Sequence, residues 1–219
     1  RKIGIGSSSA VSVAITKAFN QLFDLRLTSK EIINHSIAIH NRAQDSIGSG
    51  FDIITSFVDG RALSCRILDN GTYDYEQIDL PESIKIFVVI NDEYVQTSEM
   101  IDRYKAAKNQ YTDYFTENAP QMLSELEHLY DSILKKDNKS ILRYLNRYNE
   151  LLIDMDNKFN IGVFKNHHEL IKLSRDGDVF YKPSGSGGGD IGLLISDDKK
   201  KLDRIFEKLN LREVTFFKI

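Results

Sequence analysis

Two glycine-rich loops that carry serines lie near opposite ends of this 219-residue chain. The first reads GIGSSSA over residues 4–10, and the second reads KPSGSGGGD over residues 182–190. Glycine lacks a Cβ atom, so such a loop lets backbone N–H groups close on phosphate oxygens. A helix that starts inside the loop adds the positive end of its dipole. These residue types and their placement favour an enzyme that handles phosphate groups.

The first loop has two interpretations. A tight Gly-x-Gly turn followed by serine also occurs at ordinary helix starts, where the serine caps the N-terminus. Three successive hydroxyl groups favour a functional role. Ser7 or Ser8 could ligate Mg²⁺ or touch a phosphate while neighbouring amides bind the rest.

The second loop could be a flexible linker, because glycine and serine runs are flexible. Apolar, strand-like sequence flanks it on both sides, however, and it begins with Lys182-Pro183 and ends with Asp190. A linker requires none of these features. We therefore interpret residues 184–189 as a loop close to a ligand.

Asp52 follows Gly48 and Gly50 and opens the next apolar run, which places a carboxylate at the tip of a helix. It could cap that helix. It could also act as a general base that orients an attacking hydroxyl near phosphates. The sequence leaves both roles open. His40 and Gln44 share a helical face, and we interpret them as a partly exposed polar pair.

Composition limits the class of protein. A net charge of −3 and the lack of a long Lys/Arg block argue against nucleic acid or an anionic membrane as a partner. The single Cys65 excludes an internal disulfide and fits a reducing compartment. Residues 167–169 (HHE) lack companion ligands at metal-binding spacing, so we place them at the surface. We expect a cytoplasmic protein, and a small anionic ligand remains possible because local backbone dipoles would hold it.

Periodicity predicts helices and strands in the first half of the chain. Residues 11–23 are apolar on most sides, which predicts a helix buried within the fold. Residues 28–31 have capping-box spacing and predict a second helix to about residue 44. Strand-like runs at 62–68, 72–78 and 84–90, with a turn at 69–71, predict one antiparallel sheet.

The second half is predicted to begin with a helical layer over 97–158, interrupted near 118–120 and 136–138. A helix at 166–174 precedes strands at 179–181 and 191–195, which flank the second loop. Asp197 or Asp198 could cap a helix to about residue 209, before a strand at 213–217. This order is typical of the α+β class.

The glycine spacings of a standard P-loop and of a Rossmann fold are absent from the sequence. In motif order the chain instead resembles the GHMP kinase superfamily. Residues 4–10 are similar to that family's glycine-serine ATP loop, and 182–190 to its C-terminal glycine motif. Within the superfamily, residues 40–52 (HNRAQDSIGSGFD) and the 182–190 loop are most similar to the phosphomevalonate kinases. Ser9 and Ser186 depart from the pattern, which has alanine at both positions.

The resemblance implies roles for individual residues. Asp52 would be the catalytic base and Ser8 a Mg²⁺ ligand, while Lys2 would contact the substrate. The ATP phosphates would lie on Gly4, Gly6, Ser7, Ser8 and Ser9. Further substrate contacts would come from Ser49, Gly50, Ser184, Gly185, Ser186, Gly187 and Gly188.

The resemblance also implies an architecture and an activity. Residues 1–80 would be the remainder of an N-terminal, S5-domain-2-like α/β domain that binds ATP, and residues 81–219 a C-terminal, ferredoxin-like α+β domain. ATP and Mg²⁺ would be the cofactors, and the partner would be a small phosphorylated substrate, phosphomevalonate, as phosphoryl acceptor. The protein would be a monomer or homodimer. Another acceptor (mevalonate or a sugar) and a catalytically silent relative are the alternatives. The first loop starts three residues after Arg1, so we expect a preceding segment to be missing. We further expect both loops and Asp52 to converge on one triphosphate.

Overall fold

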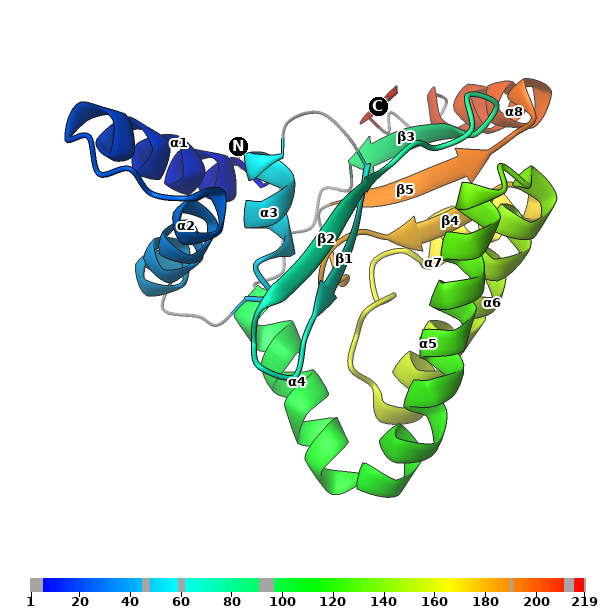
Figure 1. Cartoon of the computed structure of the whole chain (residues 1–219). Coiled ribbons are helices and arrows are strands. Elements are labelled where there is room, and N and C mark those ends of the chain that lie inside the picture. Colours follow the sequence, from blue (N-terminus) through cyan, green and yellow to red (C-terminus); the bar gives the residue numbers. More distant parts are fainter. Residues whose placement is uncertain are drawn as a thin grey trace. The chain divides into compact units, whose positions relative to one another are not determined.

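The computed structural model describes residues 6–44, 48–58, 62–90, 97–189, 191–210 and 215–218. The contacts between Cα atoms divide the chain into two compact units. The smaller unit comprises Gly4–Asp79, and the larger one contains Leu80–Ile219. Figure 1 shows the elements of both units.

The smaller unit consists of three helices and a hairpin. Its elements are α1 (Ser7–Leu22), α2 (Ser29–Gln44), α3 (Phe51–Phe57), β1 (Ala62–Ile67) and β2 (Tyr73–Ile78). Helix α1 packs against both α2 and α3. The predicted capping box starts α2. The backbone N–H of Thr28 donates to Glu31 Oε2 at 2.8 Å, and the N–H of Glu31 donates to Thr28 Oγ1 at 3.3 Å.

The prediction that α1 is buried on most sides is wrong. Its outer face exposes Val11, Ile15 and Phe19 by 56%, 46% and 54%. The buried face is made instead mainly of small hydroxyl residues, among them Ser12 and Thr16. Each of these hydroxyls donates to the carbonyl four residues earlier, at 3.1 and 2.9 Å, so it can be buried without an unpaired donor. Small side chains allow close helix packing, which the apolar pattern did not reveal.

The three predicted strands do not form one sheet. Strands β1 and β2 pair antiparallel as an isolated hairpin, with Ala62 opposite Ile78. Strand β3 (Lys85–Ile90) pairs antiparallel with two C-terminal strands in the larger unit. Both Val88 and Val89 are buried, so β3 is covered on its two faces. This burial fits the interior position of β3, between its two partner strands, in the sheet of the larger unit.

The larger unit is built on a four-stranded antiparallel sheet of order β4-β5-β3-β6. The other strands are β4 (Phe180–Pro183), β5 (Ile191–Ser196) and β6 (Thr215–Lys218). The helices are α4 (Thr97–Gln110), α5 (Thr112–Leu134), α6 (Asn138–Phe159), α7 (His168–Asp176) and α8 (Lys199–Asn210). Together the two units give the α+β class that the sequence predicts.

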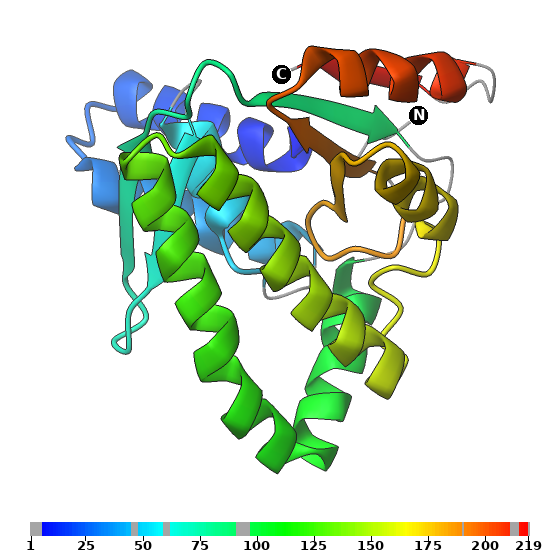
Figure 2. The ribbon, with the colours of Figure 1, turned by 90° about the vertical axis from the view of Figure 1, so that its right-hand side faces the viewer.

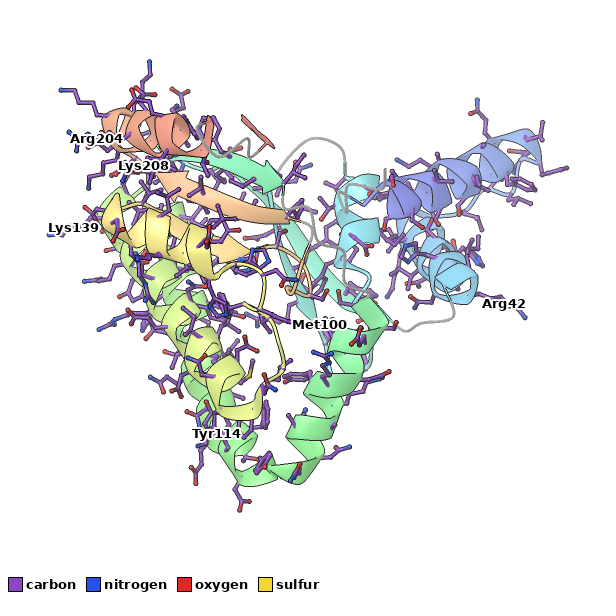
Figure 3. All side chains as sticks on the ribbon, turned by 180° about the vertical axis from the view of Figure 1, so that it is seen from behind. Arg42, Met100, Tyr114, Lys139, Arg204 and Lys208 are labelled. Atoms are coloured by element: carbon purple, nitrogen blue, oxygen red, sulfur yellow. The ribbon has the colours of Figure 1, made fainter. Side chains whose placement is uncertain are left out.

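Helices cover both faces of this sheet (Figures 1 and 2). Helices α7 and α8 share a buried cluster with Val89, Tyr181 and Leu194 of the strands. Helices α5 and α6 pack on each other, and α6 also contacts β4. On α8, the exposed side chains of Arg204 and Lys208 lie away from the sheet (Figure 3).

Two predicted boundaries of the helical layer differ in outcome. Asp137 caps α6 by accepting from the N–H of Ser140 at 3.2 Å, so the interruption near 136–138 is confirmed. Pro120, by contrast, lies inside α5, and the break comes earlier, at Tyr111. Pro120 is exposed. In the described parts of the chain, no helix combines the length and apolar character needed to cross a membrane.

Candidate functional site

The start of α1 has the geometry of an anion site. Gly6 occupies the N-cap position with φ of 78°, a left-handed conformation that favours glycine. Among the described residues, no side chain caps this end of the helix, and its first turn has no acidic residue. The backbone N–H groups of the first turn and the helix dipole together favour a bound anion there. Ser7 is exposed at this end and Ser8 is half-buried.

Ser9, the third residue of α1, contacts two residues distant in sequence. Its hydroxyl donates a hydrogen bond to Asp52 Oδ2, and its Oγ lies 3.3 Å from His40 Nε2. His40 Nε2 and Asp52 Oδ2 are 3.9 Å apart. The side chain of Ser9 is 1% exposed, whereas that of Asp52 is 47% exposed. A carboxylate that is open to solvent therefore lies beside the first turn of α1.

Asp52 is placed by the turn that precedes α3. Gly50 is buried there with φ of 78°. A Cβ atom on Gly50 would lie 2.8 Å from both Ile37 Cδ1 and the Tyr73 hydroxyl. Glycine is thus required both for the backbone conformation and for space. Asp52 Oδ1 also accepts from the N–H of Ile53 at 3.0 Å.

His40 is a contact that the sequence interpretation missed. We interpreted it with Gln44 as a partly exposed polar pair, but the His40 side chain is only 12% exposed and turns toward Ser9 and Asp52. Its separation of 31 residues from Ser9 left no local signal of this contact. The side chain of Gln44 is outside the described residues.

The structure describes some, but not all, of the residues that the sequence predicts to bind nucleotide or substrate. Gly4 and Lys2 lie outside the described residues. Gly6, Ser7, Ser8 and Ser9 all belong to the start of α1, and Ser9 meets Asp52. Ser49 is exposed, next to the buried Gly50. Their roles in binding nucleotide or substrate stay predictions.

The second loop connects β4 to β5 in the larger unit. The N–H of Ser184 donates to the carbonyl of Ile191 at 3.0 Å, and the N–H of Gly187 to that of Ser184 at 3.3 Å. Gly185, Gly187 and Gly188 have φ of 63°, 80° and 82°. Ser186 is half-buried. The hydrogen bonds and backbone angles give this loop a defined conformation.

Neighbouring segments hold the second loop closely. A Cβ atom on Gly187 would lie 2.7 Å from the carbonyl oxygen of Val163. One on Gly188 would lie 3.2 Å from Sδ of Met100, which is labelled in Figure 3. Asn166 Nδ2 donates to the carbonyl of Gly188 at 2.6 Å. The glycines at 187 and 188 therefore permit a close backbone approach.

Asp156 organises the segment against which this loop packs. Its carboxylate accepts from the N–H groups of Gly162 at 2.6 Å, Val163 at 2.9 Å and Phe164 at 2.9 Å. Asp156 is 7% exposed. A buried carboxylate that binds three backbone donors fixes the turn around it. No sequence pattern had indicated this residue.

Burial shifts the pKa of three ionisable groups before and at the start of the second loop. The surface placement of His167 is wrong, because the residue is 0% exposed and its Nδ1 lies 2.7 Å from the Tyr181 hydroxyl. Burial lowers the pKa of His167 to about 4 and raises that of Tyr181. Burial also lowers the pKa of Lys182, whose Nζ donates to the carbonyl of Pro183 at 2.9 Å. His168 and Glu169 are exposed, as predicted.

Comparison with known proteins identifies relatives of the chain. Residues 1–60 match the family model described as GHMP kinases N terminal domain. The phosphomevalonate kinase of Streptomyces sp. (strain CL190) is 25% identical, over 93% of this chain and 59% of that protein. That of Saccharolobus solfataricus is also 25% identical, over 95% of this chain and 65% of that protein. The chain thus spans about three fifths of the length of these curated relatives.

Solved structures share the fold. Streptococcus pneumoniae phosphomevalonate kinase, in complex with phosphomevalonate and AMPPNP, matches with a TM-score of 0.79 at 18% identity. The match covers 100% of this chain and 70% of that one. L. major mevalonate kinase, in complex with R-mevalonate, has a TM-score of 0.79 at 19% identity, covering 100% and 66% of the two chains. Residues 1–60 therefore match the N-terminal domain of the GHMP kinases, nearly the whole chain is similar in sequence to phosphomevalonate kinases, and it shares the fold of the two solved kinases.

Proposed function

We propose that this chain is part of an ATP-dependent kinase that transfers the γ-phosphoryl group to phosphomevalonate, which yields diphosphomevalonate. One observation carries the proposal: the half-exposed carboxylate of Asp52 lies beside the first turn of α1, held by Ser9. An uncapped helix start suits a phosphate. A fixed carboxylate next to it suits the orientation of a phosphoryl acceptor. The two curated relatives named phosphomevalonate kinase support the choice of acceptor.

The residues present fit a magnesium nucleotide. Mg²⁺ prefers oxygen ligands and usually binds through one or two protein groups together with substrate phosphates. The start of α1 offers the hydroxyl of Ser8, and the Asp52 carboxylate lies nearby. When bound, the ion would offset phosphate charge. Gly6, Ser7 and the N–H groups of the first turn would hold the phosphates of ATP, with Gly4 preceding them.

The remaining assignments extend this proposal. Residues 184–188 would contact the phosphorylated acceptor, and so would Lys2, Ser49 and Gly50. Residues 1–80 would form the remainder of the ATP-binding domain, and residues 81–219 the second domain. We place the protein in the cytoplasm, because the lone Cys65 fits a reducing compartment. We further propose that it is a monomer or a homodimer.

The acceptor determines what Asp52 must do. An alcohol needs help to lose its proton, whereas an ionised phosphate already carries a nucleophilic oxygen, so Asp52 would mainly orient it. With phosphomevalonate we therefore expect Asp52→Asn to lower kcat by about 10²-fold rather than abolish turnover. The matched control is Asp24→Asn. Asp24 is exposed and paired with Arg26, and its loss should leave kcat within about twofold of wild type.

The experiment measures ADP release from ATP with phosphomevalonate, mevalonate, homoserine and galactose as separate acceptors, together with nucleotide affinity. Turnover that requires phosphomevalonate supports the proposal. Turnover with a different acceptor refutes the choice of substrate. Nucleotide binding by the complete protein without turnover on any acceptor identifies a silent relative. Activity that survives Asp52→Asn undiminished removes Asp52 from the site.

A further inference from the structure

We propose that the Ser9 hydroxyl is a positioning group that links His40 to Asp52, rather than a ligand of the nucleotide. This inference rests on the proposed function, in which Asp52 orients the phosphoryl acceptor. The three side chains come from α1, α2 and α3, and all belong to the smaller unit. In this arrangement Ser9 sets the position of Asp52, and His40 sets the direction of the Ser9 hydroxyl.

The hydrogen-bonding capacities of the three side chains determine which group donates and which accepts in each contact. An ionised carboxylate can only accept, so the single hydroxyl hydrogen of Ser9 goes to Asp52. The Ser9 oxygen keeps its lone pairs and can accept from His40 Nε2 at 3.3 Å. The direct distance of 3.9 Å from His40 Nε2 to Asp52 Oδ2 is too long for a hydrogen bond. Ser9 is therefore the bridge between them, and His40 carries its proton on Nε2.

Burial makes the bridge effective. Ser9 is 1% exposed, so little water competes for its hydroxyl. Its backbone belongs to α1, which packs against α2 and α3 and so fixes the donor in space. Asp52 is held at both oxygens, by Ser9 at Oδ2 and by the N–H of Ile53 at Oδ1. Each carboxylate oxygen retains a further lone pair, and 47% of the side chain is open to an acceptor.

The same geometry commits the Ser9 hydroxyl to Asp52, so we do not assign it to nucleotide binding. Its hydroxyl is directed at Asp52, 43 residues further along the chain. The backbone N–H of Ser9 still lies in the first turn of α1. Loss of the hydroxyl should therefore change the chemical step more than the affinity for ATP, because a fixed carboxylate contributes through orientation.

Kinetics separate the two roles of Ser9. We expect Ser9→Ala to lower kcat about five- to tenfold while KM for ATP stays within about twofold. In the Asp52→Asn background, Ser9→Ala should have no further effect, because the two residues act as one unit. The matched control is Ser36→Ala on α2. That serine is equally buried, and its hydroxyl donates to its own helix at Ile32, so kcat should not change.

His40 provides a second variant pair. His40→Ala removes the donor to Ser9 and should lower kcat by up to about fivefold, not additively with Ser9→Ala. His40→Gln keeps an N–H donor on a side chain of similar reach and should restore part of the loss. A merely structural role for His40 would show no such rescue.

A measurement without turnover tests the contact itself. The ¹³C side-chain carboxyl signal of Asp52, assigned by its loss in Asp52→Asn, should shift in Ser9→Ala and stay in place in Ser36→Ala. An unmoved signal overturns the inference. A rise in KM for ATP with unchanged kcat, or full additivity with Asp52→Asn, also overturns it while the proposed function stands. If Asp52→Asn itself has no effect on kcat, the proposed role of Asp52 fails first.

Discussion

The backbone N–H of Gly188 donates a hydrogen bond of 2.7 Å to the carbonyl oxygen of Val163. The contact joins the second glycine loop to the turn after α6, so the loop is held by a partner more than twenty residues earlier in the chain. It also brings the two backbones so close that Gly187 has no room for a side chain.

We expect Gly187→Ala to destabilise the larger unit by about 2–4 kcal/mol. A Cβ atom would lie 2.6 Å from Val163 Cγ1 and 2.7 Å from its carbonyl oxygen, and backbone cannot yield cheaply. Gly185→Ala is the control, since its φ is also positive but nothing lies within 4 Å of its Cβ position. It should cost only about 1 kcal/mol. Urea unfolding followed by circular dichroism checks both. Equal losses in the two variants would contradict the steric argument.

A second prediction concerns the carboxylate that fixes the same turn. Asp156→Ala leaves three backbone N–H donors without their acceptor and should lower the free energy of unfolding by about 3 kcal/mol. Asp156→Asn keeps one acceptor oxygen and should cost less. Asp154→Ala, on the exposed side of α6, serves as the control. Thermal unfolding ranks the three variants, and a loss at Asp154 as large as that at Asp156 would refute the role of the buried carboxylate.

His167 makes stability depend on pH. Burial lowers its pKa to about 4, whereas histidine in an unfolded chain has a pKa of about 6.5. Between these values the unfolded state binds a proton that the folded state does not. The contribution of His167 is therefore complete above about pH 6.5 and is lost as the pH falls toward 4. From pH 7 to pH 5 the loss should be about 2 kcal/mol.

The variant His167→Gln keeps a polar group near the Tyr181 hydroxyl but removes the titrating ring. Urea unfolding at pH 7 and pH 5 should show a smaller acid-induced loss than in wild type. His35→Gln, at an exposed position of α2, should retain the full loss. The prediction fails if wild type and His167→Gln lose the same stability between the two pH values.

Gly50 gives a fourth prediction, in the smaller unit. Gly50→Ala places a Cβ atom 2.8 Å from Ile37 Cδ1 and from the Tyr73 hydroxyl, so both side chains must shift. We expect faster amide hydrogen exchange in α2 and α3. The increase should correspond to a loss of about 1–3 kcal/mol in the free energy of unfolding of these helices. Gly71→Ala has a similar positive φ but an open Cβ position, so exchange in these helices should stay unchanged. Unchanged protection in Gly50→Ala would refute the packing argument.

Local sequence determined most elements of the fold, because their signals act over a few residues. The Thr28 capping box and the predicted interruption near 136–138 place helix starts where the structure has them. Sheet membership was not predictable in the same way. Strand β3 pairs with β5 and β6 instead of joining the β1–β2 hairpin, and both partners lie far along the chain, so no local pattern reveals the pairing. Pro120 likewise permits α5 to continue, where a local rule predicts a break.

In the candidate site, too, local features could be predicted from the sequence and long-range contacts could not. The sequence by itself determined that two serine-bearing glycine loops and Asp52 suit phosphate chemistry, since residue type and helix starts are local properties. Only the tertiary structure decided that Ser9 joins Asp52 to His40, and that Asp156 and Val163 support the second loop. Such contacts depend on how helices pack across separations of tens of residues, and neither periodicity nor spacing encodes that packing.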